Sequence, residues 1–329
     1  MQCLNSLLMR EVAFIKQNKE KWLEFELGFS NKEKKSPDDI ANLHIKIMND
    51  LVYAQTYYPK SKVTTYLNKL AKTSFDKVYD SKRRDKNAFL YFFLDKVPLL
   101  SYQYRKYFYI SFIFFFICFF IGLLSTFNDE SFARQILGNT YVDQTLENIE
   151  NGDAMAIYKS GSNWGTFIGI YDNNQRVGLN MFLSGLFIGI GTGFYVVTNA
   201  IMVAVFQAFF YQNNSLFDSL KGIWIHGTYE IFGIIIEAAT GYIIGASILF
   251  PGTLKRFESF KLGVRDAFYI FISTIPFTIM AAFLEGYVTR YSNVMPTIFC
   301  FAIILFSFIT ISYYYLVLPF VVAKKHGIR

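Results

Sequence analysis

The stretch YFYISFIFFFICFFIGLLSTF, Tyr107–Phe127, contains no charged side chain. A helix rises about 1.5 Å per residue, so one of this length spans the roughly 30 Å of hydrocarbon in a bilayer. The stretch is therefore predicted to cross a membrane as a single helix. It decides the fold class, because the rest of the chain has to be compatible with a protein that resides in lipid.

Further apolar blocks follow at 178–211, 222–250, 267–284 and 298–323. They are continuous rather than alternating, which favours helices over barrel strands as the way to satisfy backbone groups inside lipid. The chain is 53% apolar and only 17% charged, too apolar for one soluble domain of 329 residues. The predicted fold class is all-α: a polytopic helical membrane bundle with an N-terminal soluble helical domain.

Residues 1–106 are polar and predict the soluble domain, without a cleavable signal peptide. Helices are expected from the SPDD start at Ser36–Asp39 to about residue 55, then over 62–79 and 85–96, with Pro98 separating this domain from the membrane. An earlier helix carries an apolar stripe that predicts a core. Its members are Phe14, Trp22, Phe25 and Phe29.

The charge distribution predicts the orientation. The net charge is +7, and residues 1–106 hold 20 Lys and Arg against 12 Asp and Glu. The segment 128–177 reverses the balance, with seven acids and three bases. Because cytoplasmic flanks collect Lys and Arg, the N-terminal domain is expected inside and 128–177 outside. The basic tail 324–329 is also expected inside. Acids interleave with the bases of the N-terminal domain, which argues against nucleic-acid binding.

The block 178–211 is long for one span and short for two. A single crossing would place the basic loop near residues 253–265 and the basic tail outside, against the charge rule. A turn-back near GIGTG, Gly189–Gly193, places every basic loop inside, and glycine permits the backbone angles of such a turn. We therefore expect the block to form two short helices or a re-entrant pair, which gives five to six crossing elements in the bundle 107–127 and 178–323.

The segment 128–177 is expected to carry an amphipathic helix. Its apolar residues recur at helical spacing and fit a helix lying against the membrane surface or a partner. These residues are Phe132, Ile136, Leu137 and Tyr141.

Ionisable residues interrupt the apolar stretch HGTYEIFGIIIEAATGYIIG, residues 226–245. On a helix with His226 at 0°, Glu230 falls at about 40° and Glu237 at about 20°, on one stripe with glycines. A carboxylate facing lipid costs roughly 2.5 kcal/mol even on the mildest scale, so the stripe is predicted to face the bundle interior.

Three roles for this stripe remain open from the residues. A metal site would need about three converging ligands, and His226 and Glu230 supply two. A proton or ion path could use Glu230, Glu237 and Glu285. The third role is a buried hydrogen-bond network, with His226 paired to Glu230 and Glu285 reaching in from another helix. Three scattered cysteines fit neither a disulfide framework nor a zinc site. No catalytic residue, metal or cofactor is predicted.

Several motifs together resemble the stage II sporulation protein M family of bacterial membrane proteins. Paired asparagines precede a glycine-rich span with GxGT and a later asparagine, followed by HGxxE and a late glutamate. These positions are Asn173, Asn174, Gly189, Gly191, Thr192, Asn199, His226, Gly227, Glu230 and Glu285. The resemblance spans nearly the whole chain. Two positions depart from the family pattern: Ile231 replaces a leucine, and Glu237 stands where the family has a small residue.

The resemblance implies a multi-pass protein of the bacterial cytoplasmic (inner) membrane, with its N-terminus inside. The eponymous member anchors a complex with peptidoglycan-degrading partners during engulfment. A non-enzymatic scaffold for envelope and cell-wall remodelling is therefore expected, with the lipid bilayer and membrane or extracytoplasmic proteins, among them cell-wall hydrolases, as partners. A homo-oligomer is compatible with this. The alternative is an ion- or proton-coupled transporter or channel component that uses Glu230, Glu237 and Glu285.

Overall fold

The computed structural model describes residues 10–30, 37–83, 87–129, 131–159 and 161–328. Every regular element within these ranges is helical, which confirms the predicted all-α class. The chain divides into two compact units, Met1–Tyr91 and Phe92–Arg329. The predicted domain boundary at residue 106 was drawn where the apolar stretch begins, whereas contacts group residues from Phe92 onward with the membrane helices.

The described residues of the N-terminal unit form four helices. They are α1 (Glu11–Ser30), α2 (Pro37–Tyr57), α3 (Lys62–Arg83) and the short α4 (Ala88–Tyr91). The second and third begin and end close to the predicted positions. The capping residue Ser36 lies outside the described residues, as does the side chain of Phe29.

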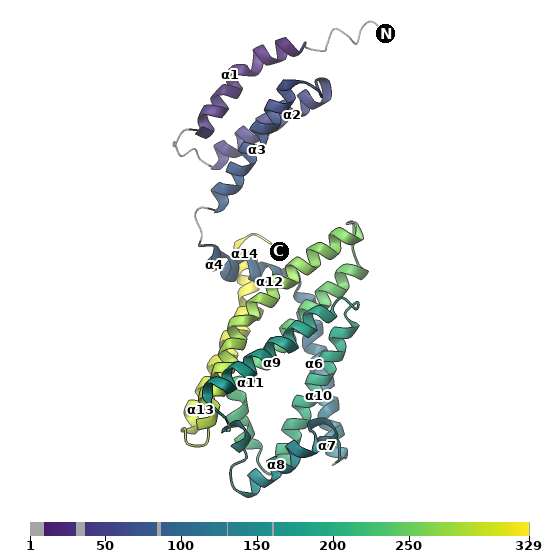
Figure 1. Ribbon diagram of the computed structural model, residues 1–329, viewed down its shortest axis with the longest axis vertical. Coiled ribbons are helices and arrows are strands. Elements are labelled where there is room, and N and C mark those ends of the chain that lie inside the picture. Colours follow the sequence, from purple (N-terminus) through teal and green to yellow (C-terminus); the bar gives the residue numbers. More distant parts are fainter. Residues whose placement is uncertain (1–9, 31–36, 84–86, 130, 160, 329) are drawn as a thin grey trace. The chain divides into compact units, whose positions relative to one another are not determined.

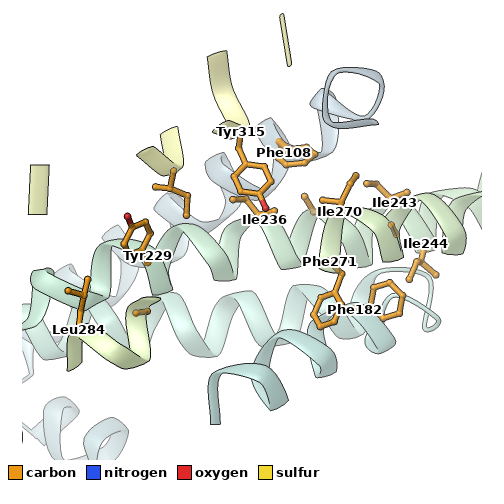
Figure 2. Packing of buried hydrophobic residues seen from close by; sticks show 14 of the residues in the cluster. Phe108, Phe182, Tyr229, Ile236, Ile243, Ile244, Ile270, Phe271, Leu284 and Tyr315 are labelled. Atoms are coloured by element: carbon orange, nitrogen blue, oxygen red, sulfur yellow. The ribbon is translucent and has the colours of Figure 1, made fainter. Parts of the chain in front are cut away.

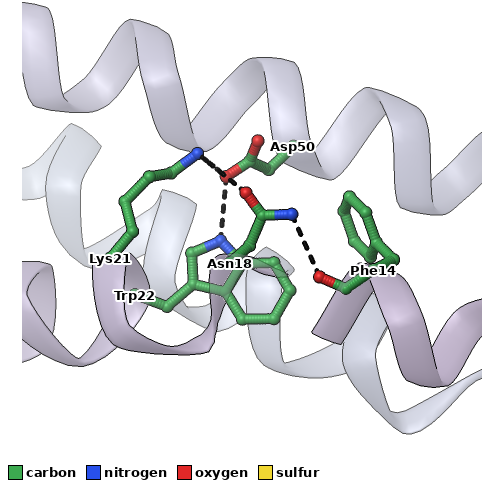
Figure 3. A network of polar contacts seen from close by, with 5 residues as sticks. All are labelled: Phe14, Asn18, Lys21, Trp22 and Asp50. Carbon is green, nitrogen blue, oxygen red and sulfur yellow. Dashed lines mark hydrogen bonds and ion pairs between the residues drawn. The ribbon is translucent and has the colours of Figure 1, made fainter. Parts of the chain in front are cut away.

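The core of this unit lies between α1, α2 and α3. Phe14, Trp22 and Phe25 of α1 are buried, which confirms three members of the predicted stripe. The indole Nε1 of Trp22 donates to Asp50 Oδ2 over 2.8 Å, and Lys21 Nζ lies 2.6 Å from the same oxygen (Figure 3). Asp50 therefore ties α1 to α2 at the edge of an aromatic core.

The second unit begins with a π-helical turn (Phe92–Lys96) that continues into α5 (Val97–Gln103). Pro98 lies in the first turn of α5, directly after this π-helical turn. The remaining elements follow in order (Figure 1). They are α6 (Arg105–Asn128), α7 (Ser131–Leu137), α8 (Asn139–Glu150), η2 (Ala156–Lys159), α9 (Asn163–Ser184), α10 (Ile190–Gln212), α11 (Leu216–Leu249), α12 (Arg256–Phe283), η3 (Leu284–Val288), η4 (Thr289–Tyr291), α13 (Thr297–Ser312), η5 (Tyr313–Val317) and α14 (Leu318–Lys325).

Five helices in the described chain are long and apolar enough to cross a membrane: 105–128, 190–212, 216–249, 256–291 and 297–325. Five crossings would leave α5 and α14 on opposite faces. These two helices are in contact, with Tyr102 and Phe320 packed edge to face. His326 Nε2 also lies 3.4 Å from Asp95 Oδ1. A sixth element must therefore run back through the bundle.

Helix α9 is that sixth element. It runs beside α11 and turns at Gly185–Gly189 into α10, so the block 178–211 does turn back. Gly189 has a φ of 79°, and Thr192 Oγ1 donates to the Met181 carbonyl across the turn. The helix starts at Asn163, well before the apolar block. The part of α9 that precedes this block has low hydropathy because it contains the charged residues Asp172 and Arg176, so the apolar pattern of the sequence does not include it. These two side chains pair on the exposed side of the helix over 2.8 Å.

Helix α11 lies at the centre of the bundle. It contacts α6, α9, α10, α12 and α13, and its most apolar window is 61% buried, the largest share among the five candidate spans. Figure 2 shows its isoleucines Ile236, Ile243 and Ile244 packed among rings and aliphatic side chains of its neighbours. Polar groups in the central part of α11, such as His226 and Glu237, are therefore enclosed by protein.

Candidate functional site

The polar stripe of α11 faces the interior of the bundle, as its spacing predicts. His226 is 3% exposed and Glu237 is 2% exposed, while Glu230 is half-buried. Three ionisable groups on a central helix require partners from neighbouring helices, since an isolated charge at this depth is costly.

The side chains that contact the imidazole of His226 belong to η3 and η4, which directly follow α12. Its Nδ1 lies 2.9 Å from Thr289 Oγ1, and its Nε2 lies 3.6 Å from Glu285 Oε2. Glu285 belongs to η3, a π-helical turn that interrupts the α-helical hydrogen-bond pattern. Such turns occur frequently at functional sites because the wider turn changes the direction of the side chains.

Glu230 accepts a hydrogen bond from a different helix, α9. Asn174 of α9 donates from Nδ2 to Glu230 Oε1 over 2.5 Å. The sequence hypothesis paired Glu230 with His226. In the structure, ligand atoms of His226, Glu230 and Glu285 lie within 4.8 Å of one another, so the three form one cluster. The hydrogen bond that Glu230 accepts comes from Asn174 of α9.

Glu237 lies apart from this cluster, further along α11. Thr274 of α12 donates to its Oε1 over 2.9 Å, and Gly178 of α9 lies directly against its carboxylate. Gln175 of α9 donates to Thr278 of α12 between the two glutamate positions. The three glutamates therefore do not form a continuous row. Glu230 and Glu285 lie together, and Glu237 lies apart from them.

The cluster and Glu237 line one cavity of about 570 Å³. Its walls come from α9, α10, α11 and the end of α12, and Leu137 of α7 and Tyr141 of α8 close part of it. The polar side chains in the wall include Asn173, Asn174, Asn199, Gln207, His226, Glu230, Glu237, Thr278 and Glu285. A largely apolar cavity with a few convergent polar groups is the usual form of a ligand site.

Beyond Glu237, close glycine packing fills the space between helices. A Cβ built on Gly241 would overlap Thr192 Oγ1 and the Met181 carbonyl, and one on Gly185 would overlap the Gly241 backbone. A Cβ on Gly245 would overlap Gly189. We call these contacts the glycine seam. It brings α11 against the α9–α10 turn and bounds the cavity on the side away from α7.

The motif residues fall into two groups. Gly189, Gly191 and Thr192 form the turn and the seam, where Gly191 packs on Ser184. Asn173, Asn174 and Gly227 line the cavity, as does Asn199. The amide of Asn199 donates to Tyr195 within α10, whereas that of Asn174 reaches across to Glu230.

Sequence reasoning missed the hydroxyl partners Thr274 and Thr289. Each is a threonine within or beside an apolar stretch and is indistinguishable from other core threonines until the helices are packed. The arrangement as a whole can bind a cation or share protons, because carboxylate and imidazole groups converge on an accessible cavity.

Comparison with known proteins agrees with this architecture. The family model for stage II sporulation protein M matches residues 111–290, which run from within α6 into η4 and include every candidate site residue. A domain of unknown function (DUF8413) matches residues 12–80, which cover most of α1, α2 and α3 in the N-terminal unit. No curated protein and no solved structure matches the chain. With more than half of its length matched, the chain is a multi-pass membrane protein that belongs to the stage II sporulation protein M family.

Proposed function

We propose that this protein is a non-enzymatic scaffold of the bacterial cytoplasmic membrane that assembles envelope proteins, among them cell-wall hydrolases. Its N-terminal unit lies inside, and segment 128–177 faces outward to meet the partners. The family assignment supports the membrane setting. The observation that carries the proposal is a folded layer, residues 131–159, fixed on one end of the bundle.

This layer consists of α7, α8 and η2, and it packs on the membrane helices through its own apolar face. Val142 and Met155 are 2% and 0% exposed, in one cluster with Phe209 and Phe210 of α10. Asp153 accepts a 2.7 Å hydrogen bond from Asn293, which precedes α13. The layer is thus held at α10 and at the loop between η4 and α13. A surface fixed in this way is pre-organised for a partner, which lowers the entropic cost of binding.

The outward face of the layer is acidic. Asp143, Glu147 and Glu150 are exposed and follow the i, i+4, i+7 spacing of one helical side of α8. Asp143 also pairs with Arg134 of α7 over 2.6 Å, so Glu147 and Glu150 supply most of the negative charge of this side. Such a stripe complements a basic patch on an extracytoplasmic partner and would steer its approach. The apolar residues of the expected amphipathic helix are divided between α7 and α8, because the helix breaks at Gly138, which has a φ of 88°. Phe132 and Leu137 pack against the cluster under the layer, whereas Ile136 is 39% exposed.

The bundle itself favours a scaffold over an open channel. The glycine seam fills the space between α11 and the α9–α10 turn, so the cavity ends against packed backbone on that side. A scaffold needs this rigidity, because partners bound at the layer must be held in a defined position.

A second candidate is an ion- or proton-coupled transporter or channel component. The observation that favours it is the shared cavity of Glu230, Glu237 and Glu285 inside the membrane domain. Intramembrane acids that face a cavity commonly serve ion pathways. In this mechanism the seam would have to open to give access from the other side.

Crosslinking in cells tests the scaffold. A photo-reactive residue at Gln144, exposed between the acids of α8, should capture an envelope protein, and capture should fall when Asp143, Glu147 and Glu150 are replaced by lysine. Asp218→Lys is the control, since Asp218 is exposed at the start of α11 outside the layer. Equal capture by the triple variant and the parent would contradict the proposal.

Flux measurements in proteoliposomes test the second candidate. Glu230→Gln and Glu237→Gln should abolish ion-coupled uptake while the protein remains folded. Uptake that survives both substitutions removes the transporter hypothesis and leaves the scaffold untouched.

A further inference from the structure

We infer that His226, Glu230 and Glu285 form a binding site for one divalent transition-metal ion, with zinc or manganese as the fitting class. The inference concerns the cavity and holds whether or not the layer binds envelope partners. It rests on the geometry of three side chains that come from two segments and meet at one wall of the cavity.

The spacing of the ligand atoms fits one ion. His226 Nε2 and Glu285 Oε2 lie 3.6 Å apart, and the atoms of all three residues lie within 4.8 Å of one another. With metal–ligand bonds of about 2.1 Å, neighbouring ligands in a tetrahedral site lie about 3.4 Å apart, and opposite ligands of an octahedral site about 4.2 Å. Small side-chain movements therefore bring all three atoms onto one ion. The 3.6 Å separation is also longer than a direct hydrogen bond.

The neighbouring residues hold the ligands as outer partners do in metal sites. Thr289 Oγ1 lies against His226 Nδ1, which leaves Nε2 directed to Glu285. The amide of Asn174 donates to one oxygen of Glu230 and leaves further lone pairs of the carboxylate for an ion. Hydrogen bonds of this kind fix the ring and carboxylate orientation and strengthen metal binding.

The two carboxylates of the cluster, Glu230 and Glu285, favour a bound cation. Within the part of the chain that the structure describes, no lysine or arginine pairs with Glu230 or Glu285. Two neighbouring carboxylates in an enclosed site repel each other unless a proton or a metal ion lies between them. A divalent ion neutralises both at once and accepts the imidazole nitrogen, which a proton shared by the two carboxylates would not engage.

The donor set selects the class of metal. One imidazole with two carboxylates suits zinc, manganese or ferrous iron, whereas calcium and magnesium prefer oxygen ligands alone. Three protein ligands leave at least one coordination position open, and that position faces the cavity. The indole Nε1 of Trp224, in the same cavity wall, is buried without a hydrogen-bond partner among the described residues.

Metal analysis of the full-length protein in detergent tests the site. After removal of metal with a chelator and dialysis against Zn²⁺ or Mn²⁺, the wild type should retain one ion per chain. His226→Asn and Glu285→Gln should each weaken binding by more than about 100-fold, and Thr289→Val by about 10-fold, as expected for an outer partner. Glu237→Gln is the matched control: it lines the same cavity, lies outside the cluster and should bind as the wild type does.

Either of two results would overturn the inference. One is a wild type that retains no Zn²⁺ or Mn²⁺ after dialysis. The other is metal binding that His226→Asn and Glu285→Gln leave unchanged. Should both variants fail to fold, X-ray absorption on the zinc-loaded wild type decides: one imidazole nitrogen with carboxylate oxygens supports the site, and a shell without nitrogen contradicts it.

Discussion

Gly178 of α9 lies directly against the carboxylate of Glu237 on α11, so close that a Cβ at this position would overlap both carboxylate oxygens. The glycine thus creates the space that Glu237 occupies, and Thr274 of α12 completes its surroundings with a hydrogen bond. The absence of a side chain at position 178 therefore matches the bulk of the carboxylate at position 237 across the contact between α9 and α11.

The first prediction follows from the contact between Gly178 and Glu237. Gly178→Ala should lower the free energy of unfolding by about 1–3 kcal/mol, because the added methyl displaces a buried, hydrogen-bonded carboxylate. Thermal unfolding of the purified protein in detergent measures the effect. Gly169→Ala, on the same helix with open space around its Cβ, should be nearly silent.

A double-mutant cycle sharpens this test. Since Glu237→Ala removes the group that the methyl meets, the two changes together should destabilise less than the sum of the single changes. Strict additivity would show that the contact between Gly178 and Glu237 carries no energy.

The second prediction concerns the glycine seam. Gly241→Ala should destabilise by about 3 kcal/mol or more, since the new Cβ meets backbone atoms of α9 that cannot move aside as a side chain can. Gly227→Ala is the control on the same helix, because its Cβ would lie 3.5 Å from Ile223, an ordinary contact. Comparable melting temperatures for the two variants would contradict the seam.

The third prediction tests the topology. In a background without Cys3, Cys118 and Cys300, a cysteine at Asp218 should react with an impermeant maleimide in intact cells. One at Glu258 should react only after permeabilisation. These exposed positions lie at the starts of α11 and α12, on opposite faces if α11 crosses once. Labelling of Glu258→Cys from outside would invert the proposed orientation, and labelling of both from outside would refute the crossing of α11.

The fourth prediction concerns the N-terminal unit. Asp50→Ala should destabilise it by about 1–3 kcal/mol, because the buried indole N–H of Trp22 loses its acceptor. Lys21→Ala should cost less than about 1 kcal/mol, since the lysine side chain is 35% exposed and solvent screens its ion pair. Hydrogen exchange of α1 and α2 in the full-length protein measures both. Equal effects would mean that the ion pair, and not the indole bond, holds the two helices together.

The sequence alone was sufficient for the membrane helices and the turn-back. Apolar blocks such as 107–127 and basic loops are local properties of the chain, so hydropathy and charge predicted α6 and the return of α9 and α10. The start of α9 at Asn163 was missed because Asp172 and Arg176 lower its hydropathy while pairing on the exposed side. The turn lies at Gly185–Gly189, slightly earlier than GIGTG, because the seam residues Gly191 and Thr192 already belong to α10.

The interior orientation of His226, Glu230 and Glu237 was likewise determined by the sequence, because helical spacing puts them on one side and lipid cannot accept them. Only the tertiary structure decided their partners. Asn174 is 56 residues from Glu230 and Thr289 is 63 from His226, and no local pattern relates such positions. The packing of α9 and of the π-helical turn η3 against α11 brings Glu285 to His226 and Glu230 and leaves Glu237 apart. The grouping of these side chains depends on where separate helices cross, so only the three-dimensional packing determines it.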